Sequence, residues 1–182
     1  MIVLSVAHTR RAQGARSPSL TEYEISKVSS RIAFDALYSA GIPCALMELG
    51  WFAQVDSIKP KQRMPSGALL AVEIHCNGSE NQSANYAETI YHSTSFSGKK
   101  AATAIIDALA RGFAAGNHGR WPSKGPRADD SLFFLRGPAP AVIVEGVFIS
   151  NPEQAAWLAS NGGCEAYGLL VAEGIKSWWS TR

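Results

Sequence analysis

Two histidines and a glutamate are the residues of this chain best placed to do chemistry. His8 and His75 each follow a short apolar run, and Glu145 interrupts the apolar, β-branched run of residues 140–151. A bare carboxylate is costly to remove from water unless it meets a counter-charge, a metal or hydrogen-bond donors. Zinc sites in hydrolytic proteins are built from histidine nitrogens and carboxylate oxygens. These three groups therefore predict a zinc site, provided that the fold brings them together.

Strands that alternate with helices would position these groups at one edge of a sheet. Strands are expected at residues 2–7, 42–49, 68–75 and 141–145, with 87–91 and 132–135 as further short strands, and helices at 21–40, 98–115, 152–160 and 165–179. This order predicts an α/β fold, a three-layer sandwich with a mostly parallel twisted sheet of about six strands flanked by helices. In such sheets ligands collect beyond the carboxyl ends of the strands. His8, His75 and Glu145 all lie at such ends.

The first helix offers a third metal ligand. Thr21 is a predicted N-cap with Glu24 as its capping-box partner three residues on, and apolar residues recur at helical spacing up to a stop at Gly41. An acidic residue in this first turn faces the same edge as the strand ends. Glu22 and Glu24 are the two candidates.

The totals describe one globular domain over residues 1–182. Hydrophobic residues make up 46% and charged residues 18% of the chain, as is typical of folded proteins. The formal charge is +2 without a basic run, which argues against nucleic acid as a partner. No apolar window indicates a membrane span and no basic-then-apolar segment a signal peptide. We therefore expect synthesis in the cytoplasm and no membrane partner.

The three cysteines do not indicate a disulfide framework or a cysteine-based zinc site, because their number is odd and their spacing irregular. Cys76 is nonetheless adjacent to His75, which raises the alternative of a cysteine hydrolase. Neighbouring residues of a strand point to opposite faces, so the two side chains are not expected to meet. We expect Cys76 to be a small buried residue.

Three segments carry a family pattern. Gly14 and Ala15 follow His8 by six and seven residues, residues 73–77 read Glu-Ile-His-Cys-Asn, and residues 140–151 read Pro-Ala-Val-Ile-Val-Glu-Gly-Val-Phe-Ile-Ser-Asn. They resemble zinc-dependent N-acetylmuramoyl-L-alanine amidases of type 3, especially the short phage and prophage endolysin forms. In that family the histidines stand in Gly-His and Ser-Ile-His-x-Asn, and the last strand reads almost as residues 140–151 do. The resemblance spans almost the whole chain.

The resemblance implies a single zinc ion and a division of roles. His8 and His75 correspond to zinc ligands and Glu145 to the catalytic carboxylate that acts as general base. The family's third ligand is a glutamate at the start of the first helix. We prefer Glu22, because the family's residue precedes the apolar face of the helix by three, as Glu22 precedes Ile25, whereas Glu24 is explained by the capping box.

The implied substrate is peptidoglycan, cut at the amide bond between the lactyl group of N-acetylmuramic acid and L-alanine of the stem peptide. Asn77, Arg136 and the loop 117–127 are expected near the site and are candidates for substrate binding. Without a signal peptide, the enzyme would reach the wall after release by a holin or host lysis. The alternatives are a non-catalytic module that binds cell-wall glycopeptide and a related zinc peptidase.

The chain departs from the family pattern in two segments. Where the family has Asp-Pro-Gly-His, this chain has Ser5-Val6-Ala7-His8, and where the family has Ser-Ile-His, it has Glu73-Ile74-His75. Glu73 is two residues from His75, so on a strand both side chains point to the same face. Glu73 is therefore expected either to support His75 from outside the site or to disturb it.

Overall fold

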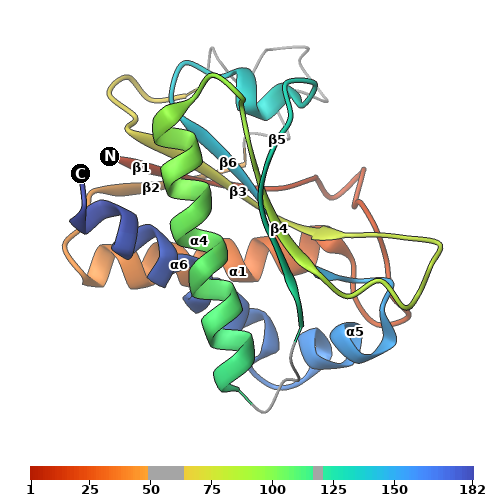
Figure 1. Cartoon of the computed structure of the whole chain (residues 1–182). Helices are drawn as coiled ribbons and strands as arrows, with labels where there is room; N and C mark the ends of the chain where they lie inside the picture. The colour runs from red at the N-terminus through yellow and green to blue at the C-terminus, as the bar shows by residue number, and fades with distance from the viewer. Residues whose placement is uncertain (49–63, 117–120) are drawn as a thin grey trace.

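The computed structural model describes residues 1–48, 64–116 and 121–182. Six strands form one sheet in the order β2-β1-β3-β6-β4-β5 (Figure 1). The strands are β1 (Ile2–Val6), β2 (Cys44–Met47), β3 (Leu70–Asn77), β4 (Ala87–Tyr91), β5 (Ser123–Ala128) and β6 (Ala141–Phe148). The first four in spatial order are parallel, whereas β4 is antiparallel to β6 and β5 is parallel to β4. The α/β class and the mostly parallel sheet expected from the sequence are confirmed.

Helices cover one face of this sheet. The chain forms α1 (Glu22–Ser39), α4 (Phe96–Ala115), α5 (Pro152–Ala159) and α6 (Gly163–Ser180). Helix α6 packs against both α1 and α4 (Figure 1), and the three bury one large apolar cluster with the strands. No helix in the described ranges is long and apolar enough to cross a membrane.

The opposite face of the sheet has a smaller apolar cluster. Here Val3, Ala71 and Ile143 pack against the 3-10 helix η1 (Phe133–Arg136). Because side chains alternate along a strand, the residues two or four positions further along β1, β3 and β6 lie on this face as well. The site described below is built on this face, towards the carboxyl ends of the strands.

Helix α1 begins where the sequence predicts. Thr21 is its N-cap and forms a complete capping box with Glu24. Buried serines on the inner side of the helix tie it to β1: Ser26 Oγ accepts from the backbone N–H of Ala7 at 2.7 Å, and Ser30 Oγ donates to the carbonyl of Ser5 at 3.4 Å. The first turn of α1 is thereby held beside the end of β1.

Two local predictions were wrong. Residues 132–135 do not form a strand: Leu132 is the N-cap of η1 and residues 133–135 belong to it, with Phe134 and Leu135 buried and Phe133 47% exposed. The polar stretch predicted as a loop contains strand β5, which pairs only with β4 and so tolerates Pro126 as an edge strand does.

Tyr167 joins helix α6 to the two central strands. Its hydroxyl donates to the carbonyl of His75 and accepts from the backbone N–H of Gly146, both at 2.9 Å, and the residue is fully buried. Tyr167 therefore links the strand of one candidate ligand to the strand of the candidate base.

We expect Tyr167→Phe to lower the free energy of unfolding by about 1–3 kcal/mol, because it leaves a buried N–H and a buried carbonyl without their hydroxyl partner. Urea denaturation followed by circular dichroism measures the loss. Tyr38→Phe is the matched control, since Tyr38 is 70% exposed and should change stability by less than about 0.5 kcal/mol. Equal stability of Tyr167→Phe and wild type would contradict this role of the hydroxyl.

Candidate functional site

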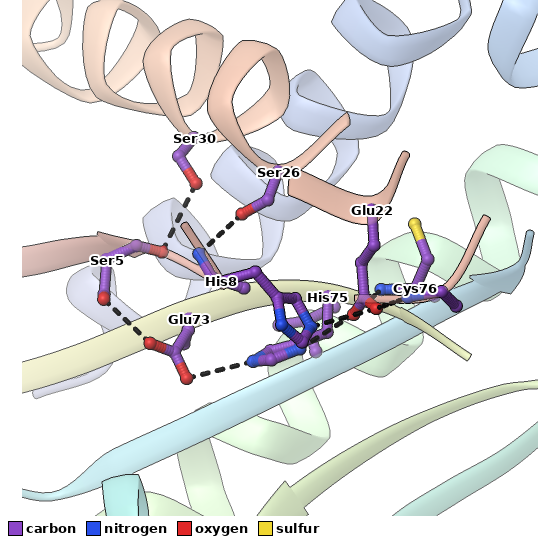
Figure 2. A network of polar contacts seen from close by, with 12 residues as sticks. Ser5, His8, Glu22, Ser26, Ser30, Glu73, His75 and Cys76 are labelled. Atoms are coloured by element: carbon purple, nitrogen blue, oxygen red, sulfur yellow. Dashed lines mark hydrogen bonds and ion pairs between the residues drawn. The ribbon is translucent and has the colours of Figure 1, made fainter. Parts of the chain in front are cut away.

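Three predicted ligands converge at the carboxyl edge of the sheet. His8 follows β1, Glu22 opens α1 and His75 lies near the end of β3 (Figure 2). One donor atom from each lies within 4.8 Å of the others. The three residues are far apart in the sequence. The tertiary fold therefore brings them together, and their spacing along the chain does not.

Glu22 lies between the two histidines. Its Oε2 is 2.9 Å from His8 Nε2 and its Oε1 is 2.9 Å from His75 Nδ1. Each oxygen also accepts a backbone N–H, from Ala15 at 2.9 Å and from Cys76 at 3.1 Å. The carboxylate is thus fixed by four contacts while only 4% of the residue is exposed.

Glu24 is directed elsewhere. Its Oε2 accepts from the backbone N–H and the hydroxyl of Thr21, at 2.9 Å and 2.8 Å, as the capping box requires. Of the two glutamates in this turn, the structure brings Glu22 and not Glu24 to the histidines.

The electrostatics of Glu22 and His75 are coupled. Burial alone would raise the pKa of Glu22, but hydrogen bonds from His75 and His8 outweigh it and hold that pKa well below its ordinary range. Burial alone would likewise lower the pKa of His75, but hydrogen bonds to Glu22 and Glu73 raise it well above 6.5. The carboxylate therefore stays charged and attracts a cation to the histidine side of the cluster.

The donor set fits a zinc ion. Two imidazoles and one carboxylate are the protein ligands of many catalytic zinc sites, which leave a further position for water or substrate. The backbone is shaped around these donors: His8 has φ 62°, and a Cβ atom at Gly14 would lie 2.4 Å from Glu22 Oε2 and 2.6 Å from His8 Nε2. Only glycine leaves room at position 14, and the left-handed backbone of His8 is the strained kind that functional sites retain.

Glu145 lies beside this cluster on the neighbouring strand. It is the register partner of His75 across β3 and β6, so the two side chains share one face. Its Oε2 is buried and has no hydrogen-bond partner among the described residues. Burial raises the pKa of Glu145 to about 7; nearby His75 opposes this shift, and the charges of Glu22 and Glu88 add to it.

Glu88 is a residue of this site that the sequence reasoning missed. It is the antiparallel partner of Glu145 across β4 and β6, is 8% exposed, and accepts from Arg127 Nε at 3.1 Å. The signal was a glutamate inside the apolar strand 87–91. That strand was expected from the sequence, but its antiparallel direction, which aligns Glu88 with Glu145, was not.

The two predicted substrate-binding residues lie at different edges. Asn77 ends β3 on the face of His75, and its buried Nδ2 has no acceptor within the described part of the chain. Arg136 does not lie at this edge: it is exposed, donates to the carbonyl of Asp130 at 2.7 Å, and borders a hollow with Pro140 at the start of β6. Its expected position was wrong, because residues 132–135 end in a 3-10 turn and not in a strand that reaches the site. Residues 117–120 of the predicted substrate loop lie outside the described residues.

Cys76 is placed as a core residue. Its side chain belongs to the apolar cluster under the helices, on the face opposite His75, and only 3% of the residue is exposed. Burial raises the pKa of its thiol well above 9, with the charges of Glu22 and Glu145 adding to the shift. A buried, protonated thiol is a poor nucleophile, which argues against the cysteine hydrolase.

Comparisons with known proteins agree with this geometry. The sequence model of the N-acetylmuramoyl-L-alanine amidase family matches residues 2–177. Among solved structures, the CwlD amidase from Clostridioides difficile in complex with the GerS lipoprotein is 20% identical, with 100% of this chain and 98% of that chain covered and a TM-score of 0.84. The amidase AmiC2 of Nostoc punctiforme is also 20% identical, with 100% and 97% covered and a TM-score of 0.82. The catalytic domain of the CD27L endolysin targeting Clostridia difficile is 24% identical, with 97% and 96% covered and a TM-score of 0.77. No curated protein sequence matches the chain.

We expect Glu22→Gln to lose bound zinc and Glu24→Gln to retain it. The first change removes the charged donor between the histidines, whereas glutamine still completes a capping box at position 24. Zinc content after dialysis, measured by atomic emission on the folded proteins, separates the two. Zinc loss in Glu24→Gln with retention in Glu22→Gln would contradict the assignment.

Proposed function

The chain belongs to the N-acetylmuramoyl-L-alanine amidase family and is a peptidoglycan hydrolase, and from this premise we propose that it works with one zinc ion and with Glu145 as its general base. The bond cut is the amide between the lactyl group of N-acetylmuramic acid and L-alanine of the stem peptide. The convergence of His8, Glu22 and His75 beside a partly buried glutamate is the observation that supports this proposal most strongly.

His8, Glu22 and His75 would hold the zinc ion. A zinc ion held there supplies Lewis acidity, which acidifies a bound water and polarises the substrate carbonyl. The chain's own contribution is to keep the donors in place. The backbone N–H groups of Ala15 and Cys76 fix Glu22 at both oxygens, so the orientation of its carboxylate does not depend on a bound metal ion.

Glu145 would move the proton. Its buried Oε2 has no partner among the described residues and is therefore free to accept a proton from the attacking water. A pKa raised to about 7 suits a group that first accepts a proton and then returns it to the departing amine of L-alanine, because both transfers are then nearly balanced at neutral pH. The carboxylate ends the cycle deprotonated, as it began.

Asn77 would orient the substrate. It is on the same face as His75, one strand step further towards the edge, and its Nδ2 can donate to a carbonyl of the lactyl group or of the stem peptide. The endolysin-like form and access to the wall through a holin or host lysis are further parts of the proposal. They rest on the resemblance of the sequence to short phage enzymes.

We expect Glu145→Gln to keep its zinc and its fold but to lose about two to four orders of magnitude in rate, because it removes a general base and keeps the shape of the side chain. Purified peptidoglycan is digested under zinc-replete conditions, and the released muropeptides are analysed by mass spectrometry. The wild type should release free stem peptides that begin with L-alanine. Glu153→Gln, which makes the same change at an exposed position in α5, is the control and should retain full activity.

Each other outcome has a definite meaning. Fragments cut within the stem peptide would identify a zinc peptidase instead of an amidase. Binding to peptidoglycan without any release by the zinc-loaded wild type would identify a glycopeptide-binding module. Zinc loss in Glu145→Gln equal to that of Glu22→Gln would make Glu145 a ligand and overturn its assignment as the base.

A further inference from the structure

Glu73 is a buried carboxylate that the proposed reaction does not use. It lies on β3 two residues before His75, and only 7% of the residue is exposed. Its Oε2 is 3.0 Å from His75 Nε2, and its Oε1 accepts from Ser5 Oγ at 2.9 Å (Figure 2). Both oxygens of this carboxylate therefore have a partner, and one partner is a candidate metal ligand.

These contacts bear on which nitrogen of His75 keeps its proton when the ring is neutral. A carboxylate can only accept, so Nε2 must donate a hydrogen to Glu73. Nδ1 faces a second carboxylate, Glu22 at 2.9 Å, so it is also placed to donate as long as no cation is bound. When a metal ion replaces the Nδ1 hydrogen, the ring is neutral and its remaining hydrogen is the one on Nε2. Glu73 thus favours the form of the ring in which Nε2 keeps its hydrogen and Nδ1 is the nitrogen available to a metal ion.

The His75 ring separates Glu73 from the metal-binding atoms. Glu73 contacts the Nε2 side of the ring, whereas Glu22 contacts the Nδ1 side (Figure 2). Glu73 is accordingly absent from the group of atoms that converge within 4.8 Å, which consists of His8, Glu22 and His75 in the described part of the chain. Its position supports the ring from outside the site and does not compete for the ion.

Ser5 holds the carboxylate in place from the neighbouring strand. Ser5 and Glu73 are register partners across β1 and β3. Both also lie in segments in which this chain departs from the family pattern, which has an aspartate where this chain has Ser5 and a serine where it has Glu73. In this chain the carboxylate of the pair is on the strand of His75.

We propose that Glu73 is a positioning residue, which accepts the Nε2 hydrogen of His75, fixes the orientation and tautomer of the ring, and is itself held by Ser5. The inference rests on the proposed role of His75 as a zinc ligand. Outer carboxylates of this kind typically strengthen metal binding about 10–100-fold.

The test compares Glu73→Gln with Glu80→Gln. Both changes remove one negative charge and keep the side-chain shape, but Glu80 is exposed in the loop after β3. Zinc affinity is measured by competition with a fluorescent chelator at constant pH. We expect Glu73→Gln to weaken zinc binding about 10–100-fold. Glu80→Gln should bind zinc like the wild type.

A second measurement reports on the hydrogen bond itself. In protein with ¹⁵N-labelled histidine, the Nε2–H signal of His75 should be protected from exchange with water, with and without zinc. Glu73→Gln should accelerate that exchange, because a charged acceptor is replaced by a weaker neutral one. Ser5→Ala removes only the hydroxyl that supports the Glu73 carboxylate, so it should weaken zinc binding and accelerate the exchange by smaller amounts than Glu73→Gln. It provides the test if Glu73→Gln does not fold.

Unchanged zinc affinity and unchanged exchange in the folded variants would overturn the proposal. Tighter zinc binding in Glu73→Gln would overturn it as well, because Glu73 would then disturb the site. If the wild type binds no zinc, the proposed function fails, but the exchange measured without metal still decides whether Glu73 holds the ring.

Discussion

The contact on which this site depends is the buried Glu22 carboxylate between His8 and His75. A charge removed from water is costly unless partners meet it, and here two imidazoles and two backbone N–H groups do so. These partners come from the ends of two parallel strands and from the loop between β1 and α1. The serines of α1 that bind β1 therefore matter for chemistry as well as packing, because they set how far the first turn reaches over the sheet edge.

The strand register places Glu145, the candidate base, beside the candidate ligand His75. His75, Glu145 and Glu88 are consecutive partners across β3, β6 and β4, so one row of the sheet has a candidate ligand, a candidate base and a second carboxylate. The Tyr167 hydroxyl of α6 hydrogen-bonds to the backbone of both β3 and β6 and so fixes these two strands relative to each other. Groups on central strands keep their mutual distances better than groups on loops, which suits a reaction that needs a proton acceptor close to a metal ion.

Much of this arrangement could be predicted from local patterns, and the rest depends on contacts that local patterns do not encode. Thr21 and Glu24 form a recognisable capping box, so their spacing predicts the start of α1. It also predicts that Glu24 is used by the cap, which leaves Glu22 as the candidate ligand. Strands that end in His8, His75 and Glu145 were recognisable as apolar runs. Glu88 was missed because nothing in residues 87–91 shows that their strand runs antiparallel. Arg136 was placed at the wrong edge because the apolar run before it forms a 3-10 turn. Strand β5 escaped notice because an edge strand needs little apolar surface.

The buried carboxylates near His75 and Glu145 affect both the binding of a cation at the histidines and the pKa of Glu145. Glu22, Glu73 and Glu88 are all buried, and each lies near Glu145 or near the histidine beside it. Their combined charge favours a cation at the histidines, and Glu22 and Glu88 are also among the charges that push the pKa of Glu145 upward. A divalent ion at the donor atoms would pull that pKa down again, since an opposite charge favours the ionised carboxylate. Arg127 limits the repulsion by pairing with Glu88. The carboxylates that would attract an ion thus also oppose the fall in the pKa of Glu145 that the bound ion would cause.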